Sequence, residues 1–128
     1  WGIAVVVLGV PRGTFYLDIL IEATAPIAER LLQALREAGF GTADLTDAQG
    51  ILANEITVFN DLVRIDVLTS TPGITFHDAW SRRETMDYQG QKFYVASRQD
   101  LIASKRAAGR PRDLEDVRIL ELVPEKNR

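Results

Sequence analysis

The chain has 128 residues, of which 46% are apolar, 26% are charged and 8% are aromatic; this is typical of one globular domain and excludes a wholly disordered chain. It contains no cysteine, which excludes disulfides, thiolate metal sites and cysteine nucleophiles. Its net charge of −3 gives no overall attraction to nucleic acid, so any RNA contact would require a local basic patch. The apolar opening at 2–10 has no basic leader and is too short to span a bilayer, so we expect a cytoplasmic protein without membrane contact.

The first apolar segment fits two structures. The valines at 5–7 favour a strand by propensity, whereas Ala4, Leu8 and the closing Gly9 would suit a short buried helix. So short an apolar run has no periodicity that decides between the two.

The next segment, 14–21, is predicted to be a strand because its residues alternate in character. Phe15, Leu17, Ile19 and Ile21 would line one face, and Tyr16, Asp18, Leu20 and Glu22 would line the other. A carboxylate fixed in mid-strand beside apolar neighbours is costly unless a cation or a hydrogen-bond donor meets it. Asp18 is therefore the first candidate for a functional residue.

The remaining elements are predicted from caps, periodicity and turn residues. A helix that Thr24 caps runs to Ala38, has one apolar stripe and ends at Gly39. One or two helical turns are expected at 46–53. The sequence then predicts a hairpin of strands 55–59 and 62–68 about Asn60-Asp61, a short helix at 75–83, a second hairpin of strands 85–88 and 91–96, a helix at 98–108 capped by Ser97, and a last helix at 112–122.

Asp18 and Asp66 each lie on a predicted strand among apolar residues. If the two strands pair, both carboxylates could project from one face of the sheet, and such hard oxygen ligands suit Mg²⁺, which takes its other ligands from water and substrate phosphates. A pair of metal ions held there would activate an attacking hydroxyl and stabilise a leaving pyrophosphate. Spacing alone favours the plainer interpretation of two partly exposed strand residues with polar partners.

The dense basic cluster of this sequence consists of Lys105, Arg106, Arg110 and Arg112, four cations within eight residues. Such a cluster suits phosphate groups. The alternative is a solvated helix face. In the same way Asp113, in the first turn of the last helix, is either part of a site or a helix cap.

Three blocks of residues follow one another in an order known from a protein family. The first is Gly2-Ile3-Ala4 followed by Gly9-x-Pro11-Arg12-x-Thr14-x-Tyr16-Leu17-Asp18-Ile19, and the second is Arg64-Ile65-Asp66-Val67-Leu68. The third is Asp100-Leu101-Ile102-Ala103-x-Lys105 followed by Gly109-Arg110-Pro111-Arg112-Asp113-Leu114-x-Asp116-Val117. Together they resemble the nucleotidyltransferase superfamily, above all the toxin-type AbiEii-like group of bacterial type IV toxin–antitoxin modules. The resemblance covers nearly the whole chain and implies one α/β (α+β) domain with a mixed β-sheet flanked by helices.

The resemblance implies the transfer of a nucleoside monophosphate from a nucleoside triphosphate to an RNA or protein acceptor, with Mg²⁺ as the cofactor. Asp18 and Asp66 would be the metal ligands and, with Lys105, the catalytic residues. The residues implied to bind the nucleotide are Gly2, Arg12, Thr14, Lys105, Arg110 and Arg112, and Asp113 or Asp116 would complete the site. The implied partners are the nucleoside triphosphate, RNA such as tRNA, an antitoxin protein and a second copy of the chain.

The sequence departs from the family pattern in three places. Tyr16 stands where a metal-binding Asp is expected, and Trp1 stands where a small Gly is usual. The strand that precedes this point in the family is not found before Trp1, so either the chain is truncated there or the fold is rearranged, and the sheet could lack its first strand. The resemblance makes residues 2–9 a short helix behind the phosphate turn, and we adopt that helix over the strand.

The change at Tyr16 leaves three functions open. A neutral phenol is a poor Mg²⁺ ligand, so the chain is either an active enzyme with an impaired site or a degenerate module that binds nucleotide, RNA or protein without catalysis. The third alternative is a structural or dimerising domain.

Overall fold

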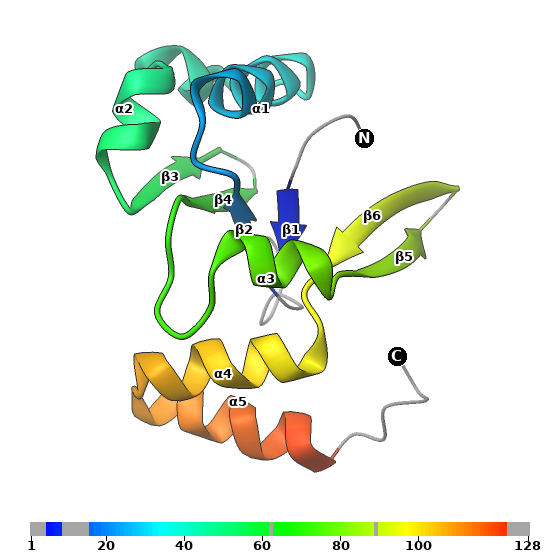
Figure 1. The fold of residues 1–128 in the computed structure, drawn as a ribbon. Helices are drawn as coiled ribbons and strands as arrows, with labels where there is room; N and C mark the ends of the chain where they lie inside the picture. Colours follow the sequence, from blue (N-terminus) through cyan, green and yellow to red (C-terminus); the bar gives the residue numbers. More distant parts are fainter. Residues whose placement is uncertain (1–4, 9–15, 62, 89, 123–128) are drawn as a thin grey trace.

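The computed structural model describes residues 5–8, 16–61, 63–88 and 90–122, which form a mixed β-sheet flanked by helices (Figure 1). The strands are β1 (Val5–Val7), β2 (Tyr16–Ile21), β3 (Ile56–Asn60), β4 (Arg64–Leu68), β5 (Glu84–Tyr88) and β6 (Gln91–Val95). The helices are α1 (Ala25–Glu37), α2 (Ala48–Ala53), α3 (Phe76–Ser81), α4 (Arg98–Ala108) and α5 (Pro111–Leu122), with a 3₁₀ helix at Gly41–Leu45. Within the described residues the sheet has six strands in the order β3-β4-β2-β1-β6-β5. The predicted fold class is confirmed.

The first strand corrects one expectation from the sequence. The short helix expected at 2–9 is wrong, because Val5–Val7 is a strand in the middle of the sheet, antiparallel to β2 and parallel to β6. Val5 and Val6 are buried, on opposite faces of β1, so β-branched side chains that pack on both sides of the sheet favour the strand. β1 therefore lies between β2 and β6 and joins the two halves of the described sheet.

The two hairpins form as the sequence predicts. β3 is antiparallel to β4, and β5 is antiparallel to β6. At the turn between β3 and β4, the Asp61 carboxylate accepts a hydrogen bond of 2.7 Å from the Thr42 hydroxyl. This contact ties the turn to the 3₁₀ helix, which the sequence did not predict.

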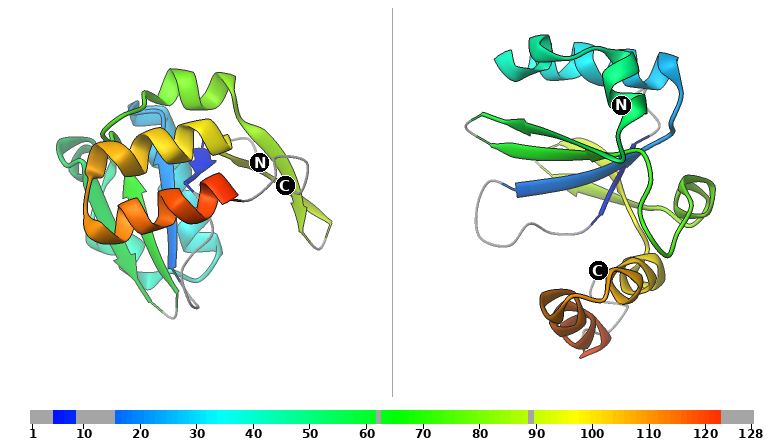
Figure 2. Two further views of the ribbon diagram at one scale, coloured as in Figure 1. Left: turned by 90° about the horizontal axis from the view of Figure 1, so that it is seen from below. Right: turned by 90° about the vertical axis from the view of Figure 1, so that its left-hand side faces the viewer.

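Helices cover both faces of the sheet (Figure 2). α1 and α2 pack on one face, over the main hydrophobic core of Val5, Ile19, Ile21, Ala28, Leu31, Leu32, Leu35, Ala43, Ile51, Phe59 and Val67. On the other face, α3, α4 and α5 cover a smaller cluster of Val6, Ala96 and Leu101, with Leu8, Phe76, Trp80 and Leu120 packed against it. Because side chains alternate along a strand, Asp18 and Asp66 belong to this second face.

The loop after β4 passes close to α4 at Gly73. This glycine has a φ of +88°, and a Cβ atom built on it would lie 2.5 Å from the carbonyl oxygen of Ala103 and 2.8 Å from the Cβ of Ala107. Beside it, the hydroxyls of Thr71 and Ser104 are 3.4 Å apart. Only a residue without a side chain fits this backbone and this gap, so Gly73 sets how closely α4 approaches the sheet.

A buried ion pair anchors the start of α4. The Ser97 hydroxyl accepts a hydrogen bond from the backbone N–H of Asp100, as predicted for this N-cap. The Asp100 residue is 1% exposed, and its carboxylate accepts hydrogen bonds of 2.7 to 3.2 Å from the Arg82 guanidinium, which follows α3. Because a buried carboxylate requires such a partner, the pair fixes α4 against α3 and thereby places Lys105, in the middle of α4.

Candidate functional site

Asp18 and Asp66 lie side by side on the sheet. β2 and β4 are parallel neighbours, and their register places Asp18 directly beside Asp66. Residues in register on neighbouring strands point to the same side of the sheet. Both carboxylates therefore point to the face that carries α4 and α5, which is the geometry that the paired-strand hypothesis requires.

The two carboxylates differ in their partners. Arg64, two residues before Asp66 on β4, donates hydrogen bonds from Nε at 2.8 Å and from one terminal nitrogen at 3.1 Å to the two oxygens of Asp66. This forked geometry is the strong form of an arginine–carboxylate pair. The Asp18 carboxylate makes no hydrogen bond or ion pair with any residue in the described part of the chain.

Several charges surround Asp18. Burial raises the pKa of the Asp18 carboxyl, the neighbouring charge of Asp66 raises it further, and the cations of Lys105, Arg64 and Arg110 lower it. Because Asp18 keeps part of its surface in solvent, water moderates these effects. Asp18 thus lies beside one carboxylate and near three cations that come from three segments of the chain.

The cations from α4 and from the α4–α5 turn are already engaged with carboxylates of α5. Nζ of Lys105 is 2.9 Å from an oxygen of Asp116. Arg110 donates from two nitrogens to Asp113, and these hydrogen bonds raise the pKa of Arg110 and lower the pKa of Asp113. An anionic ligand that reached Lys105 and Arg110 would therefore compete with two ion pairs.

The structure thus brings together four of the residues singled out from the sequence: Asp18, Asp66, Lys105 and Arg110. Three others, Gly2, Arg12 and Thr14, lie outside the described residues. Arg112 is exposed in the first turn of α5, and its charge is not among those that shift the pKa of Asp18.

Sequence reasoning missed the role of Arg64. Its signal is the spacing of two residues between Arg64 and Asp66, which places both side chains on one face of a strand. Two ion pairs depend on how α4 packs on α5: Lys105 with Asp116, and Arg110 with Asp113. Sequence reasoning singled out these residues but could not predict which of them pair.

Asp18 and Asp66 supply two adjacent carboxylates, and both oxygens of Asp66 already accept hydrogen bonds from Arg64. Among the described residues, no group of three or more His, Cys, Asp or Glu side chains is arranged to hold a metal ion. Mg²⁺ in nucleotide sites takes one or two carboxylates, with waters and phosphates as its remaining ligands, and Asp18 and Asp66 provide two. A second ion would need a further carboxylate, and position 16, two residues before Asp18 on β2, is Tyr.

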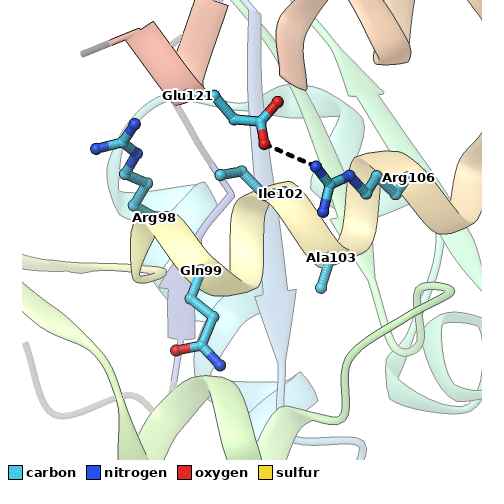
Figure 3. Close-up of a pocket in the computed structure, with 6 residues that line it drawn as sticks. All are labelled: Arg98, Gln99, Ile102, Ala103, Arg106 and Glu121. Atoms are coloured by element: carbon cyan, nitrogen blue, oxygen red, sulfur yellow. Dashed lines mark hydrogen bonds and ion pairs between the residues drawn. The ribbon is translucent and has the colours of Figure 1, made fainter. Parts of the chain in front are cut away.

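A separate open hollow of about 560 Å³ lies along α4 and α5, lined by Arg98, Gln99, Ile102, Ala103, Arg106 and Glu121 (Figure 3). None of these lining residues belongs to the charged cluster of Asp18, Asp66, Lys105 and Arg110. Arg106 reaches Glu121 across it with a hydrogen bond of 2.7 Å, and both side chains are about half exposed. Because such an exposed ion pair contributes little and no buried polar group lines the hollow, we place the candidate site at Asp18 and Asp66.

Comparison with known proteins adds no family assignment: no family model matches the chain, and no curated protein matches it significantly. Among the described residues, no helix combines the length and the apolar character that crossing a membrane requires.

Proposed function

We propose that this chain is a nucleotidyltransferase-like domain that binds a nucleoside triphosphate with one Mg²⁺ ion at Asp18 and Asp66, and that it transfers the nucleoside monophosphate slowly. The observation that carries the proposal is the in-register pair of Asp18 and Asp66 on one face of the sheet. The order of sequence motifs supports the same assignment, with RNA or a protein as the acceptor.

Each residue of the cluster has a separate task in this proposal. Arg64 holds Asp66 in one orientation through two hydrogen bonds, so that Asp66 presents its oxygens beside Asp18. Lys105 and Arg110 exchange their α5 carboxylates for phosphate oxygens when the nucleotide binds. Mg²⁺, when bound, supplies positive charge that neutralises the phosphates and polarises the reacting phosphoryl group.

Tyr16 is the reason for expecting slow transfer. Phosphoryl-transfer sites with two metal ions stabilise both the attacking and the leaving oxygen, and a site with a single ion lacks one of these contributions. A loss of several kcal/mol of transition-state stabilisation corresponds to a rate reduction of about a thousandfold. Nucleotide binding needs only one metal ion and is therefore retained.

The test measures binding and transfer separately. Isothermal titration calorimetry with a non-hydrolysable nucleoside triphosphate analogue is expected to show binding that requires Mg²⁺ in the parent chain and that is lost in Asp18→Asn and in Asp66→Asn. Transfer of label from radiolabelled nucleoside triphosphates to RNA is expected to be slow in the parent and faster in Tyr16→Asp, which adds a carboxylate two residues before Asp18.

Two controls make the experiment decisive. The double variant Tyr16→Asp/Asp66→Ala is expected to lose the gained transfer, because the metal pair would lack one of its carboxylates. The proposal is overturned if the parent binds no nucleotide in the presence of Mg²⁺, or if Asp18→Asn and Asp66→Asn bind as tightly as the parent.

A further inference from the structure

The edge of the sheet next to the candidate site exposes two aliphatic side chains. Ile56 and Val58 lie on β3, the edge strand, and are 53% and 45% exposed. The register places Val58 directly beside Asp66 and Ile56 directly beside Leu68. Both side chains are therefore on the same face of the sheet as Asp18, and we call this surface of Ile56 and Val58 the β3 shelf.

The helices leave the β3 shelf open. In the row of side chains that crosses the sheet beside the site, Val6 on β1 and Leu20 on β2 are buried, Leu68 on β4 is half-buried and Ile56 on β3 is exposed. The helices α3, α4 and α5 thus bury this face of the sheet at β1 and β2 and leave it increasingly exposed toward β3.

Aliphatic residues at such a place are unusual. Edge strands are commonly protected by charged side chains or proline, because an exposed apolar edge promotes aggregation. β-branched residues such as Ile56 and Val58 are also stiff, so they present a fixed apolar surface. This surface is continuous with the charged cluster, because Val58 adjoins Asp66, and Asp66 adjoins Asp18.

We infer that the β3 shelf receives the nucleoside, base and ribose, of the nucleotide whose phosphates lie at Asp18, Asp66 and Lys105; this inference rests on the proposed function. Strands are about 4.8 Å apart, so the shelf begins about 10 Å from Asp18, across two strand spacings. An extended nucleoside triphosphate carries, beyond its charged phosphates, a planar base whose ring faces make apolar contacts, which matches an apolar shelf beside a charged cluster. The open shelf provides apolar contact without a closed pocket, so it would bind different bases with similar affinity.

The test separates the nucleoside from the phosphates by comparing two ligands, a non-hydrolysable nucleoside triphosphate and inorganic tripolyphosphate, each with Mg²⁺. The shelf variant is Ile56→Thr/Val58→Thr, in which both replacements remain β-branched and suit a strand. We expect it to bind the nucleotide about five- to tenfold more weakly than the parent and tripolyphosphate about equally. The matched control is Met86→Thr, which removes a 42% exposed apolar side chain from β5, the opposite edge strand, and we expect it to change neither affinity.

The outcomes distinguish this inference from the proposed function. If tripolyphosphate binds and the shelf variant leaves the affinity for nucleotide unchanged, or lowers both affinities equally, the shelf does not receive the nucleoside and the inference is overturned. If neither ligand binds the parent, the proposed function fails and the inference fails with it. If sedimentation shows that the parent is a dimer and the shelf variant a monomer, while the ratio of the two affinities is unchanged, the shelf instead contacts a second copy of the chain.

Discussion

Replacing Gly73 by alanine should destabilise the fold by more than its backbone conformation alone accounts for. The new Cβ would meet the carbonyl oxygen of Ala103 at 2.5 Å and the Cβ of Ala107 at 2.8 Å, so either α4 or the loop after β4 must move. A left-handed backbone costs a residue with a side chain about 1 kcal/mol, and overpacking adds about 1 to 3 kcal/mol. We therefore expect Gly73→Ala to lower the free energy of unfolding by about 2 to 4 kcal/mol.

Gly39→Ala is the matched control for this substitution. Gly39 has a φ of +91°, similar to that of Gly73, but a Cβ atom there would have no neighbour within 4 Å. It should therefore cost only the backbone contribution of about 1 kcal/mol. For a domain of this size, 1 kcal/mol shifts Tm by about 3 to 5 °C, so thermal unfolding followed by circular dichroism separates the two variants. Equal losses of Tm in Gly73→Ala and Gly39→Ala would refute the close approach of the loop to α4.

Three further predictions concern the charged cluster. Asp18→Asn should raise the free energy of unfolding at pH 7, because the raised pKa of Asp18 means that folding disfavours its charged form. In urea titrations this gain in stability should shrink as the pH falls through the raised pKa and should vanish below about pH 4. A loss of stability at pH 7 would contradict the prediction. Asp113→Asn should lower the free energy of unfolding at pH 7 by about 1 kcal/mol, because Arg110 lowers the pKa of Asp113. The difference in unfolding free energy between variant and parent should disappear as the pH falls below about 4, through the lowered pKa. A difference that stays the same at every pH would count against the ion pair. Lys105→Ala should weaken the affinity for the Mg²⁺–nucleotide about tenfold in calorimetry and should make that affinity less dependent on salt. Arg112→Ala should change the affinity little. Equal effects of the two variants would show that Lys105 acts only through general surface charge.

Most of the fold could be predicted because its signals are local. The alternation in β2, the hairpin turn at Asn60-Asp61 and the cap at Ser97 each act within a few neighbouring residues, and each element forms where it was expected. β1 was assigned wrongly because its strand has only three residues, and it is stabilised by β2 and β6, which follow much later in the chain. The valines at 5–7 favour a strand by their β propensity, and this propensity was a better guide than the family resemblance, which implied a helix.

The candidate site could be predicted only in part. The sequence indicated Asp18 and Asp66 because each interrupts an apolar strand, and pairing of β2 with β4 brings them together. The contacts of Lys105 with Asp116, and of Gly73 with Ala103, depend on distances between elements that no local pattern encodes. The β3 shelf was equally hidden, because a strand predicted at 55–59 does not show whether helices cover Ile56 and Val58.

The most direct test of the central claim is to locate the metal ion. Mn²⁺ can replace Mg²⁺ beside a non-hydrolysable nucleoside triphosphate, and its unpaired electrons broaden the NMR signals of nearby backbone amides. The proposed site predicts the strongest broadening at the amides around Asp18 and Asp66, with those of α1, on the opposite face of the sheet, unaffected, and loss of the effect in Asp18→Asn/Asp66→Asn. Broadening centred elsewhere, or unchanged in that double variant, would contradict a metal–nucleotide site on this face of the sheet.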